Sequence, residues 1–526
     1  MMNKELSRAF FCFIFLTIST LVVNAGQAYP RAEQQPNILF LFADDWGRFA
    51  SSYRGLDPTG FSELITTPNV DRLATEGILF TNAFNPVPSC TPSRGAIVTG
   101  QYFWRNGRAV NLGGGEWPAE PSVWEAQPKF PRILEYLGYL VAYSGKVGVE
   151  WWKDQPIENR FIRDEHRYSK HGNTFMNFSE TVSGQPDTKK ARQAVLDEVR
   201  ANFQDVLSAR KPGQPFFYWF GTFTAHRAWV QGSGKALWGI DPDALRGKMP
   251  ADWPDSHTVR EDVTDYLGEV QAFDAMAGVL LDELEKAGLL DTTLVVATGD
   301  NGIPGFPRAK RNLYDKGVYA PLMIRWPGKS KGGRVVSDFV NLFDLAPTFI
   351  EAAGGVPPKS MDAASLMAVI ESNKSGRVDK DRDYVILGRE RHVFHRPMRA
   401  LRNDRYLLVH NLRLEDSEVI PDGPIDATRY MNIDGGPTAQ YIIDNIEKPE
   451  VRRLYELAFD RRPEFELYNV KTDPDQIENL AAKPKHKKTL EKLREQLRTT
   501  LTERKDPRFS GDFSRFDRSP YIETDR

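Results

Sequence analysis

One cysteine, one arginine and one helix start lie within five residues of each other. Cys90 is followed by Pro92 and Arg94, and the small residues after Arg94 can begin a packed helix. A helix N-terminus and a fixed cation both stabilise negative charge. The arrangement therefore predicts a nucleophile inside a site that handles an anionic group.

Oxygen ligands follow two distant apolar runs. Asp44 and Asp45 come directly after one run, and Asp300 and Asn301 come directly after another. Such ligands suit calcium or magnesium rather than zinc, and the chain has no closely spaced histidine and cysteine pattern of the zinc type. We expect a hard-cation site; a solvated turn is the alternative reading of the aspartate pair taken alone.

Cations and one histidine complete this inventory. Lys146 and His226 each follow an apolar run, and Lys310 comes shortly after Asp300. A metal ion and several cations around one nucleophile fit the transfer of a sulfuryl or phosphoryl group. That chemistry depends mostly on positioning and on electrostatic stabilisation.

The elements that must position these residues read as a doubly wound α/β core. A long helical pattern runs from Arg260 to Ala287, and short apolar segments alternate with helical ones. The segments expected to be buried strands are 38–43, 78–84, 139–144, 215–220, 293–298 and 321–326. Ligands of such sheets bind beyond the carboxyl ends of the strands, where the polar residues fall.

The 526 residues exceed one ordinary domain. We expect a catalytic domain over 29–375 and a smaller C-terminal α+β subdomain over 376–526, with the boundary in the loose stretch Val356–Asp383. The second part has strand-like pieces and a charged helix from Lys485 to Arg504. The net charge of −2 offers no global positive field, so no nucleic-acid partner is expected.

The N-terminus has the pattern of a secretory signal peptide over residues 1–28. Lys4 and Arg8 precede an apolar run from Ala9 to Val23, and small residues suited to cleavage follow. The alternative is an uncleaved membrane anchor, but the run is shorter than the roughly 20 apolar residues of a spanning helix. We therefore expect a periplasmic or secreted protein without a membrane span after signal cleavage.

Signal cleavage leaves Cys90 as the only cysteine, because Cys12, the other one, lies in the apolar run. Cys90 then has no partner for an intrachain disulfide. A buried inert cysteine is the alternative to a functional one. The neighbouring Pro92 and Arg94 favour a function.

The segment Cys90–Arg94, CTPSR, resembles the C-x-P-x-R signature of the formylglycine-dependent sulfatases, and Gly100 completes its longer T-G element. The resemblance runs from Pro36 to about Leu480, and it includes the two aspartate motifs described above. Within the family, the chain resembles most the heparan N-sulfatase (N-sulfoglucosamine sulfohydrolase) branch, and also bacterial polysaccharide sulfatases. The segments that carry this second likeness are DNGIP at 300–304, NLY at 312–314, RPMR at 396–399 and LVHNL at 408–412.

The resemblance implies the alkaline-phosphatase-like fold, a doubly wound and mostly parallel sheet with a smaller C-terminal domain. It also implies that a formylglycine-generating maturation enzyme oxidises Cys90 to formylglycine (3-oxoalanine), whose hydrate is the nucleophile. One Ca²⁺ would be held by the residue at position 90 together with Asp44, Asp45, Asp300 and Asn301.

The same resemblance assigns roles to the cations. Arg94 would stabilise the hydrate, and Lys146 and Lys310 would hold the sulfate oxygens. His226 would lie beside the leaving group, as a sulfate ligand or a proton donor.

The chain departs from the family pattern at two positions. Gly148 stands where the family has a histidine in G-K-x-H, and Lys310 stands where the N-sulfatase branch usually has arginine. In family schemes that histidine helps desulfation of the formylglycine. A water molecule or a histidine from elsewhere, such as His166 or His171, would have to replace it; both of these histidines also read as surface residues.

The expected activity is hydrolysis of sulfate esters or N-sulfates of a carbohydrate in polysaccharide degradation, of the ulvan or glycosaminoglycan type. A phosphonate or phosphate monoester hydrolase of the same fold is one alternative, and a catalytically impaired carbohydrate-binding relative is another. For recognition of the sulfated oligo- or polysaccharide, two groups are candidates, with a solvated strand face and core packing as the respective alternatives. They are the basic cluster Arg389, Arg391, His392, His395 and Arg399, and the tryptophans Trp104, Trp151, Trp152 and Trp229.

Overall fold

The structure is a computed structural model that describes residues 35–111, 121–148, 162, 164–415, 433–511 and 514–517. The expected signal peptide, residues 1–28, lies outside the described residues, as do Trp151 and Trp152. Within the described ranges, no helix is both long enough and apolar enough to cross a membrane.

A seven-stranded sheet forms the centre of the molecule, in the order β3-β4-β1-β5-β6-β2-β7. Only β6 runs antiparallel to its neighbours, and the other pairs are parallel. The strands are β1 (Asn37–Ala43), β2 (Ile78–Phe84), β3 (Leu140–Gly145), β4 (Phe216–Thr222), β5 (Thr293–Gly299), β6 (Leu322–Arg325) and β7 (Arg334–Asn341). The expected mostly parallel sheet is confirmed.

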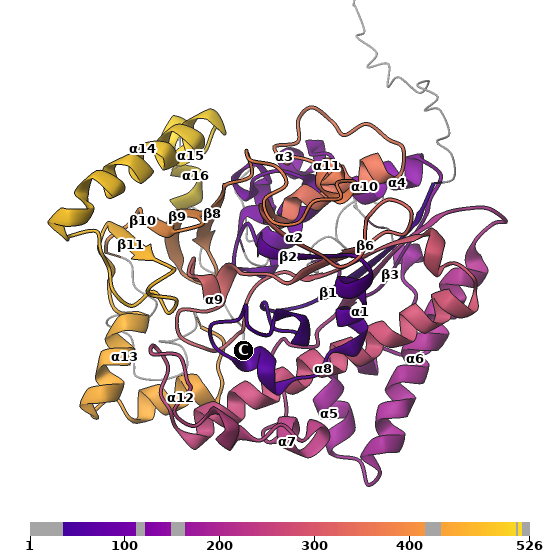
Figure 1. Cartoon of the computed structure of the whole chain (residues 1–526), viewed down its shortest axis with the longest axis horizontal. Helices are drawn as coiled ribbons and strands as arrows, with labels where there is room; N and C mark the ends of the chain where they lie inside the picture. Colours follow the sequence, from indigo (N-terminus) through magenta and orange to yellow (C-terminus); the bar gives the residue numbers. More distant parts are fainter. Residues whose placement is uncertain are drawn as a thin grey trace, which may run out of the picture.

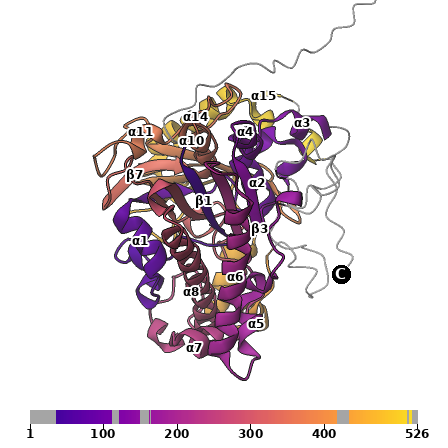
Figure 2. The same ribbon diagram turned by 90° about the vertical axis from the view of Figure 1, so that its right-hand side faces the viewer.

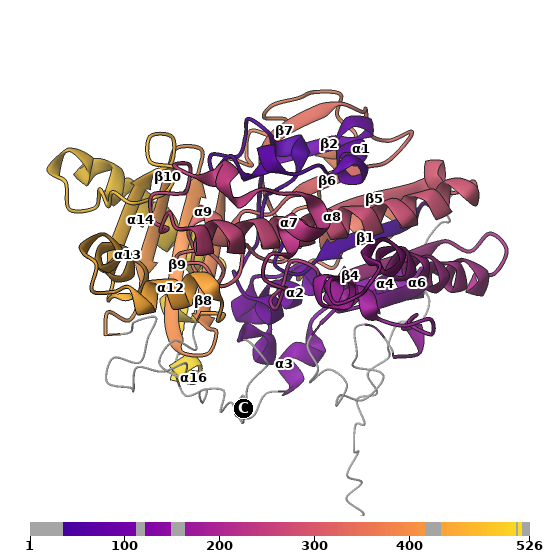
Figure 3. The same ribbon diagram turned by 90° about the horizontal axis from the view of Figure 1, so that it is seen from below.

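Helices cover both faces of this sheet, which explains the unbroken apolar sequence of β1. Leu39 and Leu41 pack into one core cluster, and Ile38 and Phe40 pack into a second cluster on the opposite face. The first face carries α1 (Pro68–Glu76), α6 (Thr188–Ala209) and α8 (His257–Lys286); the second carries α2 (Cys90–Thr99), α4 (Phe130–Tyr136) and α10 (Leu345–Ala352). Figure 2 shows α6 and α8 side by side, and Figure 3 shows α8 along the sheet.

A second, antiparallel sheet follows in the chain, in the order β11-β10-β9-β8. Its strands are β8 (Tyr384–Arg391), β9 (His395–Asn403), β10 (Tyr406–Asn411) and β11 (Phe465–Asn469). Leu493 and Leu497 of α14 (Lys487–Glu503) pack against one face, and Figure 1 shows this helix, in yellow, outside the sheet. The other face packs on the part of the molecule that contains the central sheet, where Leu387 and Leu407 meet Phe84 of β2.

The remaining helices are short connecting elements. They are α3 (Pro121–Ala126), α5 (Phe178–Ser183), α7 (Ser233–Trp238), α9 (Asp315–Val318), α11 (Met367–Ile370), α12 (Pro437–Asp444), α13 (Pro449–Phe459), α15 (Pro507–Ser510) and α16 (Ser514–Asp517). Of these, α12 packs against α8, so a segment from the C-terminal part of the chain reaches the helices that cover the central sheet.

Candidate active site

The ends of β1 and β5 bring the predicted oxygen ligands together. The two strands are parallel neighbours, and Ala43 pairs with Gly299, so Asp44 and Asp300 leave the sheet side by side. The backbone N–H of Asp45 donates to Asp300 Oδ1 at 2.9 Å. Asp44, Asp45, Asp300 and Asn301 are all fully buried.

Cys90 reaches the same place from the other side, as the first residue of α2. Its sulfur lies 4.0 Å from Asp45 Oδ1 and 3.9 Å from Asn301 Nδ2. Burial raises the pKa of the thiol to about 12, with the Asp44 carboxylate adding to the shift. An unmodified thiol at this position therefore stays protonated at neutral pH and is a weak nucleophile.

The donor set fits a hard divalent cation. One oxygen each from Asp44, Asp45 and Asp300 and the sulfur of Cys90 all lie within 4.8 Å of one another. Asn301 Oδ1 is buried and accepts no hydrogen bond from any described residue. Three carboxylates and one unpaired amide oxygen are the ligands that Ca²⁺ prefers. These residues could hold such an ion.

Arg94 lies behind the carboxylates rather than in front of the cysteine. Its Nε donates to Asp300 Oδ2 at 2.7 Å, and its Nη2 donates to Asp44 Oδ1 at 3.0 Å. Its Nη1 donates to the carbonyl of Lys146 at 2.8 Å. The guanidinium therefore holds the carboxylates of Asp44 and Asp300 in place.

The two lysines pair with the other carboxylate oxygens. Lys146 Nζ lies 2.6 Å from Asp44 Oδ2, and Lys310 Nζ lies 2.7 Å from Asp45 Oδ2. Burial alone would raise the pKa of Asp44, but Lys146 and Arg94 hold that pKa well below its usual range. Burial raises the pKa of Asp45 to about 7, although Lys310 opposes the shift. A cation bound among these groups would favour the ionised carboxylates.

His226 is the histidine of this group. Its Nε2 lies 3.8 Å from Asp45 Oδ2, and its ring nitrogen belongs to a set with Asp44 and Cys90 whose ligand atoms lie within 4.8 Å of each other. Burial, with help from Lys310, lowers the pKa of His226 to about 4. All predicted catalytic and metal residues thus meet in one place, which we call the strand-end cluster: Asp44, Asp45, Cys90, Arg94, Lys146, His226, Asp300, Asn301 and Lys310.

The two histidines suggested as substitutes for the one missing at Gly148 lie elsewhere. His171 Nε2 lies 3.1 Å from Asp205 Oδ2, and His166 Nε2 lies 3.8 Å from Glu165. Their partners are acidic residues outside the strand-end cluster. Among these three histidines, His226 is therefore the one that lies in the strand-end cluster.

Two residues of the C-terminal part join the cluster without having been predicted there. His392, in the turn between β8 and β9, shares a 2.8 Å hydrogen bond with Ser89, the residue before Cys90. Asp434 forms a close ion pair with Arg311 and lies 3.3 Å from Lys310 Nζ. Asp434 follows no apolar run and matches no motif, so the sequence carried no signal for it.

The expected basic recognition cluster is buried, so the alternative of a solvated strand face is wrong. Arg389, Arg391, His392 and His395 are each at most 5% exposed. Arg399 pairs with Glu390 at 2.6 Å and with Asp506 at 2.5 Å, so its expected reach toward a substrate is also wrong. The burial of these side chains depends on tertiary packing, which the local sequence does not reveal.

The two described tryptophans, Trp104 and Trp229, pack in the core, as the alternative interpretation predicted. Trp104 is buried and its indole N–H donates to the carbonyl of Arg504 at 3.2 Å. The indole N–H of Trp229 donates to Asp262 at 3.1 Å. Neither ring is available as an open stacking platform for a sugar.

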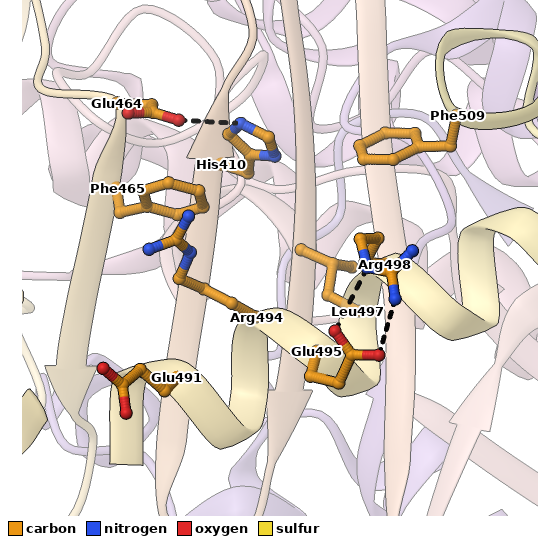
Figure 4. A pocket seen from close by; sticks show the side chains of 9 residues that line it. All are labelled: His410, Glu464, Phe465, Glu491, Arg494, Glu495, Leu497, Arg498 and Phe509. Atoms are coloured by element: carbon orange, nitrogen blue, oxygen red, sulfur yellow. Dashed lines mark hydrogen bonds and ion pairs between the residues drawn. The ribbon is translucent and has the colours of Figure 1, made fainter. Parts of the chain in front are cut away.

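A separate cavity of about 330 Å³ lies between the second sheet and α14 (Figure 4). His410 stacks on Phe465 with ring centres 4.3 Å apart, and Arg494 lies over Phe465 at 4.0 Å. Its lining includes no residue of the strand-end cluster. The cavity is therefore distinct from the predicted catalytic site.

Solved structures share this architecture. The structure of BT4656 in complex with its substrate D-glucosamine-2-N,6-O-disulfate superposes with a TM-score of 0.61 at 20% identity, covering 90% of this chain and 99% of that one. The phosphonate monoester hydrolase of Agrobacterium radiobacter gives a TM-score of 0.59 at 17% identity, covering 89% and 96%. At these identities the likeness establishes the fold, which is the one that the sequence predicted.

Sequence relatives identify the family. Human N-sulphoglucosamine sulphohydrolase is 28% identical over 93% of this chain and 93% of its own length. An ulvan-active sulfatase of Formosa agariphila is 26% identical over 89% of this chain and 75% of its own length. The family signature described as N-sulphoglucosamine sulphohydrolase, C-terminal matches residues 306–460, and the signature described as Sulfatase matches residues 36–356. The chain therefore belongs to the sulfatase family, a family of sulfuric ester hydrolases.

Proposed function

We propose that this protein releases sulfate from a sulfated saccharide, with position 90 as the nucleophile after conversion of Cys90 to formylglycine. The observation that carries the proposal is the position of Cys90, which faces Asp45 and Asn301 where two lysines also converge. The saccharide class rests on the relatives, since the named activities of the human and Formosa agariphila proteins concern sulfated sugars.

Asp44, Asp45, Asp300, Asn301 and the side chain at position 90 would hold one Ca²⁺ ion. Bound there, the ion supplies positive charge that lowers the pKa of an adjacent hydroxyl and stabilises negative charge on sulfate oxygens. A formylglycine hydrate supplies that hydroxyl in place of the thiol.

Four side chains of the cluster would bind the sulfate, assist the leaving group and position the carboxylates. Lys146 and Lys310, whose ammonium groups lie 2.6 Å from Asp44 and 2.7 Å from Asp45, would bind the sulfate oxygens. His226 lies beside the leaving atom as a sulfate ligand or a proton donor. Its Nδ1 donates to the carbonyl of Arg227, so the ring is a cation whenever Nε2 also carries a proton. Arg94 keeps Asp44 and Asp300 in the positions that the ion needs.

Sulfate release from a defined panel tests this function. The panel contains N-sulfoglucosamine, glucosamine 6-sulfate, ulvan oligosaccharides and 4-nitrophenyl sulfate, and the protein is coexpressed with a formylglycine-generating enzyme. The proposal predicts sulfate release from at least one saccharide. An enzyme that releases phosphate from 4-nitrophenyl phosphate faster than sulfate from the matched sulfate would contradict it.

The second candidate function is phosphonate or phosphate monoester hydrolysis. It is favoured by the similarity of the fold to the phosphonate monoester hydrolase of Agrobacterium radiobacter. The comparison of the two aryl esters separates this candidate from the first. If Gly148 impairs turnover, the enzyme should bind these esters but release neither sulfate nor phosphate from them.

We also propose that the protein is exported, since residues 1–28 have the pattern of a signal peptide. Cell fractionation and the N-terminal sequence of the mature protein test this. A mature protein that retains Met1 and stays with the cytoplasmic fraction would contradict it.

A further inference from the structure

Asp434 is one of the more exposed side chains at the strand-end cluster. The side chains of His226, Asp434 and Lys146 are 27%, 21% and 15% exposed. Lys310 is only 2% exposed, and Asp45 is fully buried. Of these five side chains, His226, Asp434 and Lys146 are therefore the ones that solvent reaches most.

One oxygen of Asp434 takes part in an ion pair but accepts no hydrogen bond. Its Oδ1 pairs with Arg311, whereas its Oδ2 forms an ion pair with Lys310 Nζ at 3.3 Å and accepts no hydrogen bond from any described residue. A buried acceptor that makes no hydrogen bond can still accept one from a ligand.

The segment that carries Asp434 is fixed to the loop that carries His226. Thr438 donates to Asp262 Oδ2 from its backbone N–H at 3.1 Å and from its hydroxyl at 2.6 Å. Arg227, next to His226, donates to the same oxygen at 2.7 Å. Gly436 packs so closely on the Arg227 guanidinium that a Cβ atom would lie 2.4 Å from it.

These contacts give Asp434 a fixed position relative to His226. Asp262 binds both segments, so the acceptor at position 434 and the imidazole at position 226 move together. A carboxylate held in this way is preorganised to contact the part of the substrate that lies next to the leaving atom.

We propose that Asp434 determines specificity, by accepting a hydrogen bond from an N–H or O–H group of the saccharide next to the scissile sulfate. This rests on the proposed function. The donor is either the N–H of an N-sulfated amine or a hydroxyl that neighbours a sulfate ester. The negative charge also disfavours a second sulfate or a carboxylate at that position, which Lys310 and Arg311 alone would attract.

The test compares Asp434→Ala and Asp434→Asn with the wild-type enzyme on the saccharides of the panel and on 4-nitrophenyl sulfate, which has no neighbouring donor. We expect kcat/KM of Asp434→Ala to fall about tenfold or more further on the saccharide than on the aryl sulfate, as for a lost hydrogen bond to a charged group. Asp434→Asn keeps an acceptor oxygen, so its kcat/KM on the saccharide should fall less than that of Asp434→Ala. A selective loss on N-sulfoglucosamine assigns the donor to the N–H, and a selective loss on a sulfate ester assigns it to a hydroxyl.

Asp315→Ala is the matched control, because Asp315 pairs with Arg402 at 2.9 Å and has a side chain 15% exposed. The ratio of its kcat/KM on the saccharide to its kcat/KM on the aryl sulfate should equal that of the wild type. Equal losses of Asp434→Ala on both substrates would overturn the inference, since Asp434 would then act only by holding Lys310 and Arg311. A wild-type enzyme active on the aryl sulfate alone would also overturn it. A wild-type enzyme that releases sulfate from nothing in the panel contradicts the proposed function, and the inference with it.

Discussion

Arg94 bridges Asp44 and Asp300, the first residues after two neighbouring parallel strands. Its Nε reaches Asp300 at 2.7 Å and its Nη2 reaches Asp44 at 3.0 Å, and all three side chains are fully buried. The arginine of the cysteine motif thus holds the two aspartates together and ties α2 to the edge of the central sheet.

Arg94→Lys should abolish most of the sulfate release, because an ammonium group cannot span two carboxylates as a guanidinium does. Arg94→Ala leaves two buried carboxylates without their partner and should destabilise the fold by about 3–5 kcal/mol. Urea unfolding and sulfate release measure the two effects. Arg382→Lys, at the half-buried pair of Arg382 with Asp344 at 2.8 Å, is the control and should lower stability without a specific loss of turnover. Full activity in Arg94→Lys would disprove the bridging role.

Removal of the metal ion should abolish turnover and lower the melting temperature. One oxygen each from Asp44, Asp45 and Asp300 and the Cys90 sulfur lie within 4.8 Å of one another, and a divalent cation would compensate the charge of the three carboxylates. Treatment with EGTA followed by addition of Ca²⁺ should remove and then restore both activity and stability. Asn301→Ala should raise the Ca²⁺ concentration needed for half-maximal activity. A chelated protein with unchanged turnover and melting temperature would rule out a metal at this position.

His226→Ala should lower kcat on a sulfated sugar by about a hundredfold or more, as expected for loss of a general acid. The loss should be smaller on 4-nitrophenyl sulfate, because nitrophenolate leaves without a proton. His171→Ala is the control, since His171 pairs with Asp205 and is outside the cluster. Equal losses on both substrates would mean that His226 binds sulfate and does not protonate the leaving atom.

The stability of the protein should fall as pH rises from about 5 to 8, in part through Glu269 of α8. Burial raises the pKa of Glu269 to about 7, so the folded state binds this proton more tightly than the unfolded state. That contribution is fully present below the unfolded pKa and is lost as pH rises through the folded value.

Glu269→Gln should therefore gain stability relative to the wild type as pH rises, by at most about 3 kcal/mol at pH 8. Urea unfolding at pH 5 and pH 8 measures the difference. Glu261→Gln, on the same helix, is the control for the substitution itself. Identical slopes in the wild type and Glu269→Gln would show that this carboxyl is not the cause.

The strands of the central sheet were predictable where both of their faces are buried. β1 and β5 are apolar at nearly every position, and their polar successors, Asp44 and Asp300, marked the site. β7, which was not predicted, lies at the sheet edge and contains Arg334, Ser337 and Asp338 among its apolar residues. Such an edge strand needs no continuous apolar run.

One long helix was missed although its sequence carried a signal. The buried residues Val195, Val199 and Phe203 of α6 recur at helical spacing, and Asp187 caps its start by accepting a hydrogen bond from Lys190 N at 3.0 Å. Asp434 had no comparable signal. Its place in the site depends on how α12 docks on α8, a long-range contact that local sequence patterns do not encode.

The most direct measurement is sulfate release by the wild type and by Cys90→Ala, each coexpressed with a formylglycine-generating enzyme. The mass of each intact protein is determined by mass spectrometry. The wild type should show the mass decrease of a thiol converted to an aldehyde at position 90, and it should release sulfate from a sulfated saccharide. Cys90→Ala should fold with a similar melting temperature and release none. A Cys90→Ala protein that desulfates the saccharide at the wild-type rate would contradict the central claim.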